Sequence, residues 1–160
     1  MTAHNHKRGG AAVSVLSALD PWEADLIMNL RLWCSGPVGQ RDVCNSYATA
    51  LPASEARCEL AAFESLLGRL TENAHRPLVR HDIGCSCVGS DEGVFAHIAA
   101  MASSGDLAEA SLVASLLVKA AHAEHIALLA GQVGTAARRM ALTRRKPVKP
   151  SARSASVTLH

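Results

Sequence analysis

The chain has 160 residues, the ordinary size of one domain, and is long enough to bury a core without disulfide or metal cross-links. Aromatic residues make up only 3% of it, which argues against an aromatic platform for stacking single-stranded nucleic acid. The net charge of +2 is unevenly distributed, because residues 9–137 hold all 14 acidic residues and fewer than half of the 16 basic ones. An acidic body with basic ends does not suit a protein whose folded face grips nucleic acid.

Residues 1–19 are expected to form a flexible arm. Lys7 and Arg8 precede a short apolar stretch that has the outline of a secretory signal peptide. That stretch is diluted by Gly and Ser, so we favour a chain without a signal. No apolar run reaches the length of a transmembrane helix, and no membrane partner is expected.

The first half of the chain predicts three helices. Asp20, Pro21 and Glu23 form a helix start, and apolar residues recur every three or four positions from there to Trp33. A second helix is predicted over residues 38–51 and a third over 54–73. Their short connections favour an antiparallel bundle.

The helical pattern stops at residues 75–90, which contain one Pro and two Gly and indicate a long loop. Helices are then predicted from Ser90 and from Asp106, the latter continuing, after a bend or a short break near residues 122–125, to about Met140. The predicted fold is therefore an all-α, single-domain bundle of five to six helices with a long central loop. The helical domain spans residues 20–142, and residues 143–160 form a disordered basic tail.

The central loop gathers most of the reactive side chains. His81, Cys85 and Cys87 could converge on a zinc ion, with a fourth ligand from Cys34, Cys44, Cys58 or His97. Zinc would also restrain a loop that lacks apolar periodicity. The Cys-x-Cys spacing is closer than that of most zinc sites, and the alternative is that both cysteines simply pack.

The same residues allow a thiol chemistry. A cysteine close to Arg80, His81 and a helix N-terminus would have a lowered pKa, although three nearby carboxylates oppose this. Cys85 and Cys87 could then act as a redox sensor, or one of them as the nucleophile of a small enzyme with His81 as its base. This alternative ranks below zinc.

Two further sets of basic residues are candidates for contacts. Arg76 and Arg80 lie beside the helix start at Ser90, where they could hold an anion or a partner, although Asp91 and Glu92 are expected to occupy that helix start. The basic C-terminal region could bind nucleic acid in a salt-dependent way, or lie along the acidic body. Its residues are Arg138, Arg139, Arg144, Arg145, Lys146 and Lys149.

Arg76 to Leu78, Arg80-His81, Cys85-x-Cys87, Gly89, Asp91-Glu92 and Phe95 carry a resemblance to a segment of small uncharacterised helical proteins of alphaproteobacteria. The resemblance extends from about Leu30 to Met140. It carries no known activity and implies that the loop is a defining feature and that the compartment is a bacterial cytoplasm.

No catalytic constellation stands out, and five cysteines without a disulfide framework also favour a reducing cytoplasm. The sequence thus predicts a non-catalytic helical protein that acts through contacts with a protein partner and has a Cys/His loop organised either by zinc or by hydrogen bonds. A nucleic-acid-associated regulator that uses the basic tail is the second hypothesis. A thiol-based redox sensor or small cysteine enzyme is the third.

Overall fold

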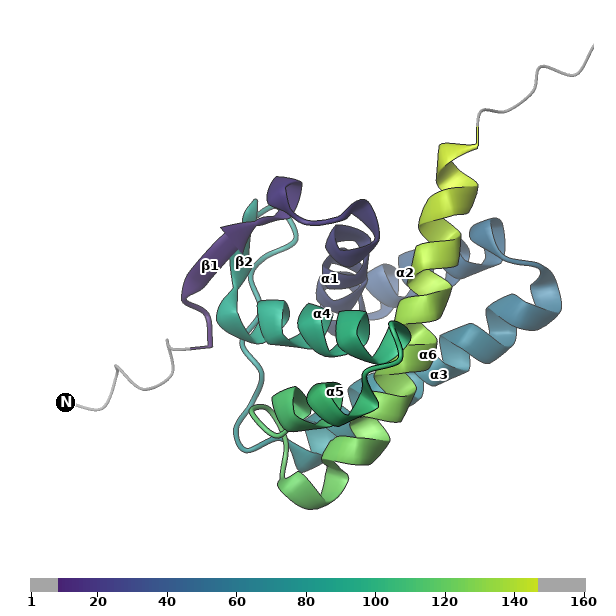
Figure 1. Cartoon of the computed structure of the whole chain (residues 1–160). Helices are drawn as coiled ribbons and strands as arrows, with labels where there is room; N and C mark the ends of the chain where they lie inside the picture. The colour runs from purple at the N-terminus through teal and green to yellow at the C-terminus, as the bar shows by residue number, and fades with distance from the viewer. Residues whose placement is uncertain (1–8, 147–160) are drawn as a thin grey trace, which may run out of the picture.

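The computed structural model describes residues 9–146, and these form a mostly helical protein (Figure 1). Its helices are α1 (Pro21–Cys34), α2 (Pro37–Ala50), α3 (Ala53–Asn73), α4 (Ser90–Ser103), α5 (Leu107–Ala114) and α6 (Ala120–Arg145). Two short strands, β1 (Ala12–Val15) and β2 (Cys87–Gly89), and a 3₁₀ turn (Leu16–Ala18) complete the described part. None of the described helices combines the length and the apolar character needed to cross a membrane.

The helix boundaries follow local capping chemistry. At the start of α1, Pro21 occupies the first turn, and the backbone N–H of Asp20 donates to Glu23 Oε2 at 3.3 Å. Asp106 Oδ1 accepts from the N–H of Glu109 and caps α5. The predicted starts at Asp20 and Asp106 are therefore confirmed.

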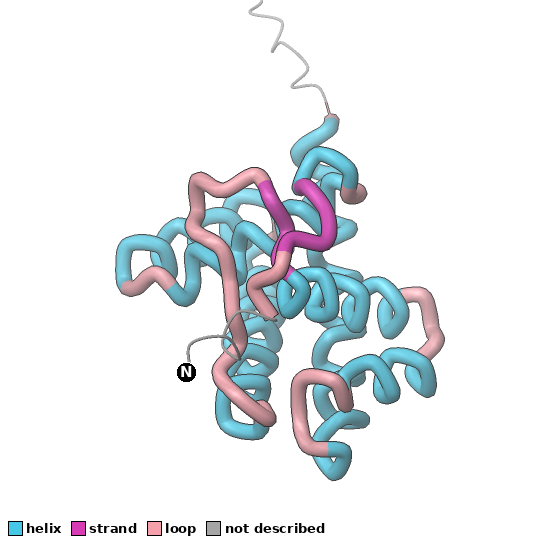
Figure 2. Tube along the Cα trace, turned by 90° about the vertical axis from the view of Figure 1, so that its left-hand side faces the viewer, coloured by secondary structure: helices cyan, strands magenta, loops and turns pink. Residues whose placement is uncertain are grey.

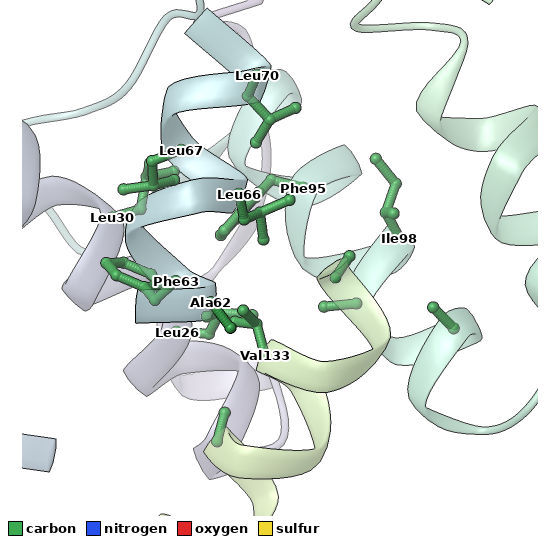
Figure 3. Close-up of a cluster of buried hydrophobic side chains, with 14 of the residues drawn as sticks. Leu26, Leu30, Ala62, Phe63, Leu66, Leu67, Leu70, Phe95, Ile98 and Val133 are labelled. Carbon is green, nitrogen blue, oxygen red and sulfur yellow. The ribbon is translucent and has the colours of Figure 1, made fainter. Parts of the chain in front are cut away.

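Helix α6 lies at the centre of the arrangement and packs against each of the other five helices (Figure 1). The core forms where α1, α3, α4 and α6 meet (Figure 3). Its largest side chains are fully buried, and they include Leu26, Phe63, Leu66, Leu70, Phe95 and Ile98. Each side chain of this size stabilises the fold by about 1.5–3 kcal/mol through removal from water.

Glycine lets α4 and α6 approach closely. A Cβ at Gly134 would lie 2.6 Å from the carbonyl oxygen of Ala99 and 3.0 Å from Ser103 Cβ. Gly131, one turn earlier, faces Ala102. Only a residue without a side chain fits the backbone contact at Gly134.

Strands β1 and β2 pair antiparallel, with Val15 opposite Cys87 and Ala12 opposite Gly89. The described residues are mostly helical, as the all-α prediction has it, but that prediction did not include this small sheet. Strand β1 lies within the predicted flexible arm of residues 1–19, of which residues 9–16 run along β2 and the start of α4 (Figure 2). Leu16 and Leu19 pack against a small apolar cluster of Ile27, Val88 and Ala96.

The C-terminal helices differ from the prediction in two places. The chain leaves the helix at residues 115–119, earlier than the expected bend, because this stretch forms backbone hydrogen bonds with the end of α3: the N–H of His75 donates to Leu117 O and that of Lys119 to Asn73 O. Helix α6 then continues to Arg145, beyond the expected end near Met140. Residues 147–160, most of the predicted tail, lie outside the described residues.

Candidate functional site

The loop of residues 74–86 is held by a buried ion pair between α1 and α4. Arg31 Nε lies 2.7 Å from Glu92 Oε1, and Arg31 Nη2 lies 2.8 Å from Glu92 Oε2. Both side chains have no solvent exposure. The contact is bidentate, the geometry in which a guanidinium binds a carboxylate most strongly.

The rest of the Arg31 guanidinium binds the loop backbone. Nη1 donates to the carbonyl oxygens of Asp82 and Cys85, and Nη2 donates to that of Cys87 at 2.6 Å. The guanidinium therefore has partners for all its donors and holds both loop cysteines through their backbones. It has no donor left to bind a ligand.

Two carboxylates at the start of α4 hold the other side of the loop. Glu92 accepts the backbone N–H groups of His81 and Gly89, at 3.0 and 2.9 Å. Asp91 accepts the N–H of Val79 at 2.8 Å and a bidentate contact from Arg76. The loop thus takes its shape from fixed charges and backbone hydrogen bonds.

The environment of Glu92 favours the ionised carboxylate. Burial alone would raise its pKa, but the hydrogen bonds from Arg31 and from the N–H groups of Gly89 and His81 outweigh burial, so the pKa lies below its ordinary value. The same pair raises the pKa of Arg31. Both groups stay charged around neutral pH.

His81 is oriented by a backbone carbonyl. Its Nε2 lies 2.6 Å from the carbonyl oxygen of Gly10, and its Nδ1 lies 3.4 Å from Cys85 Sγ. A carbonyl oxygen can only accept, so Nε2 carries the proton and Nδ1 is free to take the thiol proton of Cys85. The hydrogen bond to Gly10, followed by that to Cys85, raises the pKa of His81.

Cys85 is half-buried and lies in an environment that stabilises a thiolate. The backbone N–H of Cys87 beside its sulfur lowers the pKa of Cys85, and the His81 ring and the Cys87 thiol lower it further. Cys34 differs, because burial raises its pKa although Arg80 acts in the opposite direction. All five cysteines are free thiols.

The structure brings together part of the set predicted to bind zinc. His81 Nδ1 contacts Cys85, and the Cys87 thiol is close enough to Cys85 to affect its pKa. Within residues 9–146, however, no group of three or more His, Cys, Asp or Glu side chains is arranged to hold a metal ion. The restraint that zinc was expected to supply to the loop comes from Arg31 and Glu92. The zinc site therefore stays a prediction without a matching ligand set.

The predicted anion contacts have protein partners. Arg76 binds Asp91, and Arg80 Nη2 donates to the carbonyl oxygen of Cys34 at 2.9 Å. The first N–H groups of α4 are also occupied, since those of Ser90 and Asp91 donate to the carbonyl oxygens of Ala11 and Gly9. The N-terminal segment therefore occupies the N–H groups at the start of α4, which the sequence had suggested as an anion site.

The basic residues near the C-terminus lie mostly on α6, against the body. Arg139 pairs with Glu55, and Arg144 lies 2.7 Å from Asp25. Arg138 stacks over the Trp22 ring at 4.1 Å. Arg145 and Lys146 line shallow hollows between α6 and the α1–α2 region, and Lys149 lies outside the described residues. Among the described residues this arrangement matches the expectation that the basic end lies along the acidic body.

Sequence reasoning missed the two residues that organise the loop. Arg31 lies four residues after Ile27 on the buried face of α1, and Glu92 lies three before Phe95 on the buried face of α4. A charged residue at an apolar position is rare unless it is paired. Two opposite charges at such positions were therefore a signal that could have identified the pair.

The chain matches none of the protein-family models, curated proteins or solved structures with which it was compared.

Proposed function

We propose that this protein is a thiol-based redox sensor in which Cys85 is the reactive thiol and Cys87 the resolving thiol. The observation that carries the proposal is the contact between Cys85 Sγ and His81 Nδ1, in a ring whose other nitrogen donates to Gly10. Redox-sensing cysteines combine thiolate character, access to solvent and a second thiol nearby. Cys85 has all three features.

The chemistry requires a hydroperoxide as the oxidant. His81 takes the thiol proton, and the Cys85 thiolate attacks one peroxide oxygen, so that an S–O bond forms and the O–O bond breaks. The leaving hydroxide takes the proton from His81 and departs as water. The Cys87 thiol then attacks the Cys85 sulfenic acid, so that an S–S bond forms, the S–O bond breaks and a second water leaves. With hydrogen peroxide, the two thiols lose two electrons and the peroxide gains them.

Two features favour this proposal over a structural zinc loop. The loop backbone already has an internal restraint in the Arg31–Glu92 pair, so it has no need of a metal to hold its shape. The His81 ring is also arranged as a base oriented by a third group, which is the geometry of an activated thiol. A signal passed to a protein partner remains compatible with this function.

The test is disulfide formation in the full chain with Cys34, Cys44 and Cys58 changed to Ser, which leaves the two loop thiols. Dilute hydrogen peroxide should produce a Cys85–Cys87 disulfide, seen as the loss of two mass units and of both alkylation sites. In this background Cys87→Ser should instead leave a sulfenic acid on Cys85 that a dimedone-type reagent captures.

His81→Gln provides the matched control for thiol activation. It should slow the reaction of Cys85 with peroxide by about tenfold, because the base is lost while the Arg31–Glu92 pair is retained. Peroxide that leaves both loop thiols reduced while it oxidises the unmodified chain at Cys34 or Cys58 would contradict the proposal.

A further inference from the structure

The N-terminal segment of residues 9–15 is attached to the thiol site almost entirely through backbone atoms. The carbonyl oxygens of Gly9 and Ala11 accept from the N–H groups of Asp91 and Ser90, at 2.8 and 2.9 Å. The carbonyl of Gly10 binds His81. The side chains contribute little to this attachment, since Val13 and Val15 are 61% and 41% exposed.

The residues that follow this segment are anchored to the body of the protein by apolar side chains. Leu16 and Leu19 pack against the apolar cluster of Ile27, Val88 and Ala96, which anchors the chain from residue 16 onward. Residues 9–15 can therefore detach without disturbing the main core. Segments held by few apolar contacts open with the lowest free energies.

His81 and Cys87, the two residues that interact with the Cys85 sulfur, both contact this segment. The ring of His81 lies between Cys85 Sγ and the Gly10 carbonyl, and Cys87 is the first residue of β2, paired with Val15. Figure 2 shows β1 lying along β2 where the loop ends. A change at either sulfur therefore acts on a residue that holds the segment.

We infer that oxidation of Cys85 and Cys87 releases the N-terminal segment of residues 9–15 from β2 and the start of α4. This inference rests on the proposed redox function and adds its structural consequence. Two contacts weaken together. A disulfide brings its Cβ atoms to about 3.8 Å, which pulls Cys87, the first residue of β2, towards the loop and away from its pairing with Val15. At the same time the Cys85 sulfur no longer shares a proton with His81 Nδ1, so the ring that donates to Gly10 loses one of the two contacts that orient it.

Hydrogen exchange of the backbone amides tests the inference in the full chain lacking Cys34, Cys44 and Cys58. The N–H groups of Ser90, Asp91 and Leu16 report directly, because their acceptors are Ala11, Gly9 and Ser86. Peroxide should speed the exchange of these three amides by about tenfold or more, while amides in α3 stay unchanged. In the same background Cys85→Ser should show no response to peroxide.

A second variant defines the released state without oxidation. A Cβ at Gly9 would lie 2.2 Å from Asp91 Oδ2, so Gly9→Val should detach the segment and give the fast exchange of Ser90 and Asp91 in the reduced protein. Linkage requires the converse effect, so the Cys85–Cys87 disulfide should be harder to reduce in Gly9→Val than in the parent chain.

The outcomes separate the two proposals. A disulfide that forms while the amides of Ser90, Asp91 and Leu16 keep their protection overturns the inference and leaves the redox function intact. Unchanged disulfide stability in Gly9→Val also overturns it. Failure of the disulfide to form overturns the redox function and the inference with it.

Discussion

At the scale of single residues, the Arg31–Glu92 pair is the most consequential contact, because it is fully buried and also holds five backbone groups of the loop and β2. Removing one charge leaves the other buried and unpaired. Glu92→Gln should therefore lower the free energy of unfolding by about 3 kcal/mol or more. The matched control is Glu55→Gln, which breaks the exposed pair with Arg139 and should cost less than about 1 kcal/mol. Urea unfolding measures both, and equal losses would contradict the account.

The same carboxylate predicts how stability depends on pH. The folded-state pKa of Glu92 is lower than its unfolded value of 4.5, so its contribution is present above that value and is lost as pH falls through the folded-state pKa. The difference in stability between the natural chain and Glu92→Gln should shrink as the solution is acidified below pH 4.5. A difference that stays constant down to strongly acidic pH would show that the carboxylate charge has no part in it.

At Tyr47, in contrast to Glu92, removing a buried polar group should not lower the free energy of unfolding. Its ring packs near Phe63, but its hydroxyl is buried without a hydrogen-bond partner among the described residues, and burial raises its pKa. Tyr47→Phe removes the unpaired hydroxyl and keeps the ring, so the free energy of unfolding should stay the same or rise by up to about 1 kcal/mol. Tyr47→Ala, which removes the ring, should cost about 3–5 kcal/mol. A loss above 1 kcal/mol in Tyr47→Phe would reveal a partner for the hydroxyl.

At the scale of helices, the contact between α4 and α6 depends on Gly134. Alanine is normally the better helix former, by about 1 kcal/mol. Gly134→Ala should nevertheless destabilise the protein by about 1–3 kcal/mol, because the new methyl meets the Ala99 carbonyl. Gly68, on the exposed face of α3, has nothing within 4 Å of a Cβ, so Gly68→Ala should be neutral or stabilising. The melting temperature should therefore fall in Gly134→Ala and stay the same or rise in Gly68→Ala.

The helices could be predicted because their causes are local. Apolar spacing and the caps at Asp20 and Asp106 placed α1 and the start of α5 within a few residues. The strand β1 could not be predicted in this way. It exists because Ala12–Val15 meets β2, more than 70 residues away, and only the fold brings the two together. The break at residues 115–119 likewise depends on a distant partner, the end of α3.

At the scale of the whole molecule, the candidate site joins four parts of the chain: the N-terminal segment, α1, the loop and the start of α4. The sequence identified His81, Cys85 and Cys87 because reactive residues gather locally in the loop. It placed zinc above thiol chemistry because the loop lacked any visible restraint. That restraint comes from Arg31, which is 50 or more residues away from its loop partners, so the sequence could not show that it reaches the cysteine carbonyls.

The central claim is that the fold activates Cys85, and the pH dependence of its alkylation tests this claim most directly. The rate of reaction with iodoacetamide would be followed by mass spectrometry in Cys87→Ser, in which Cys85 is the only loop thiol, both folded and unfolded in urea. The account predicts a lower midpoint pH for Cys85 in the folded chain, because the backbone N–H of residue 87 and the His81 ring still stabilise the thiolate, and a rise of that midpoint on His81→Gln. A folded midpoint equal to or above the unfolded one would contradict the account.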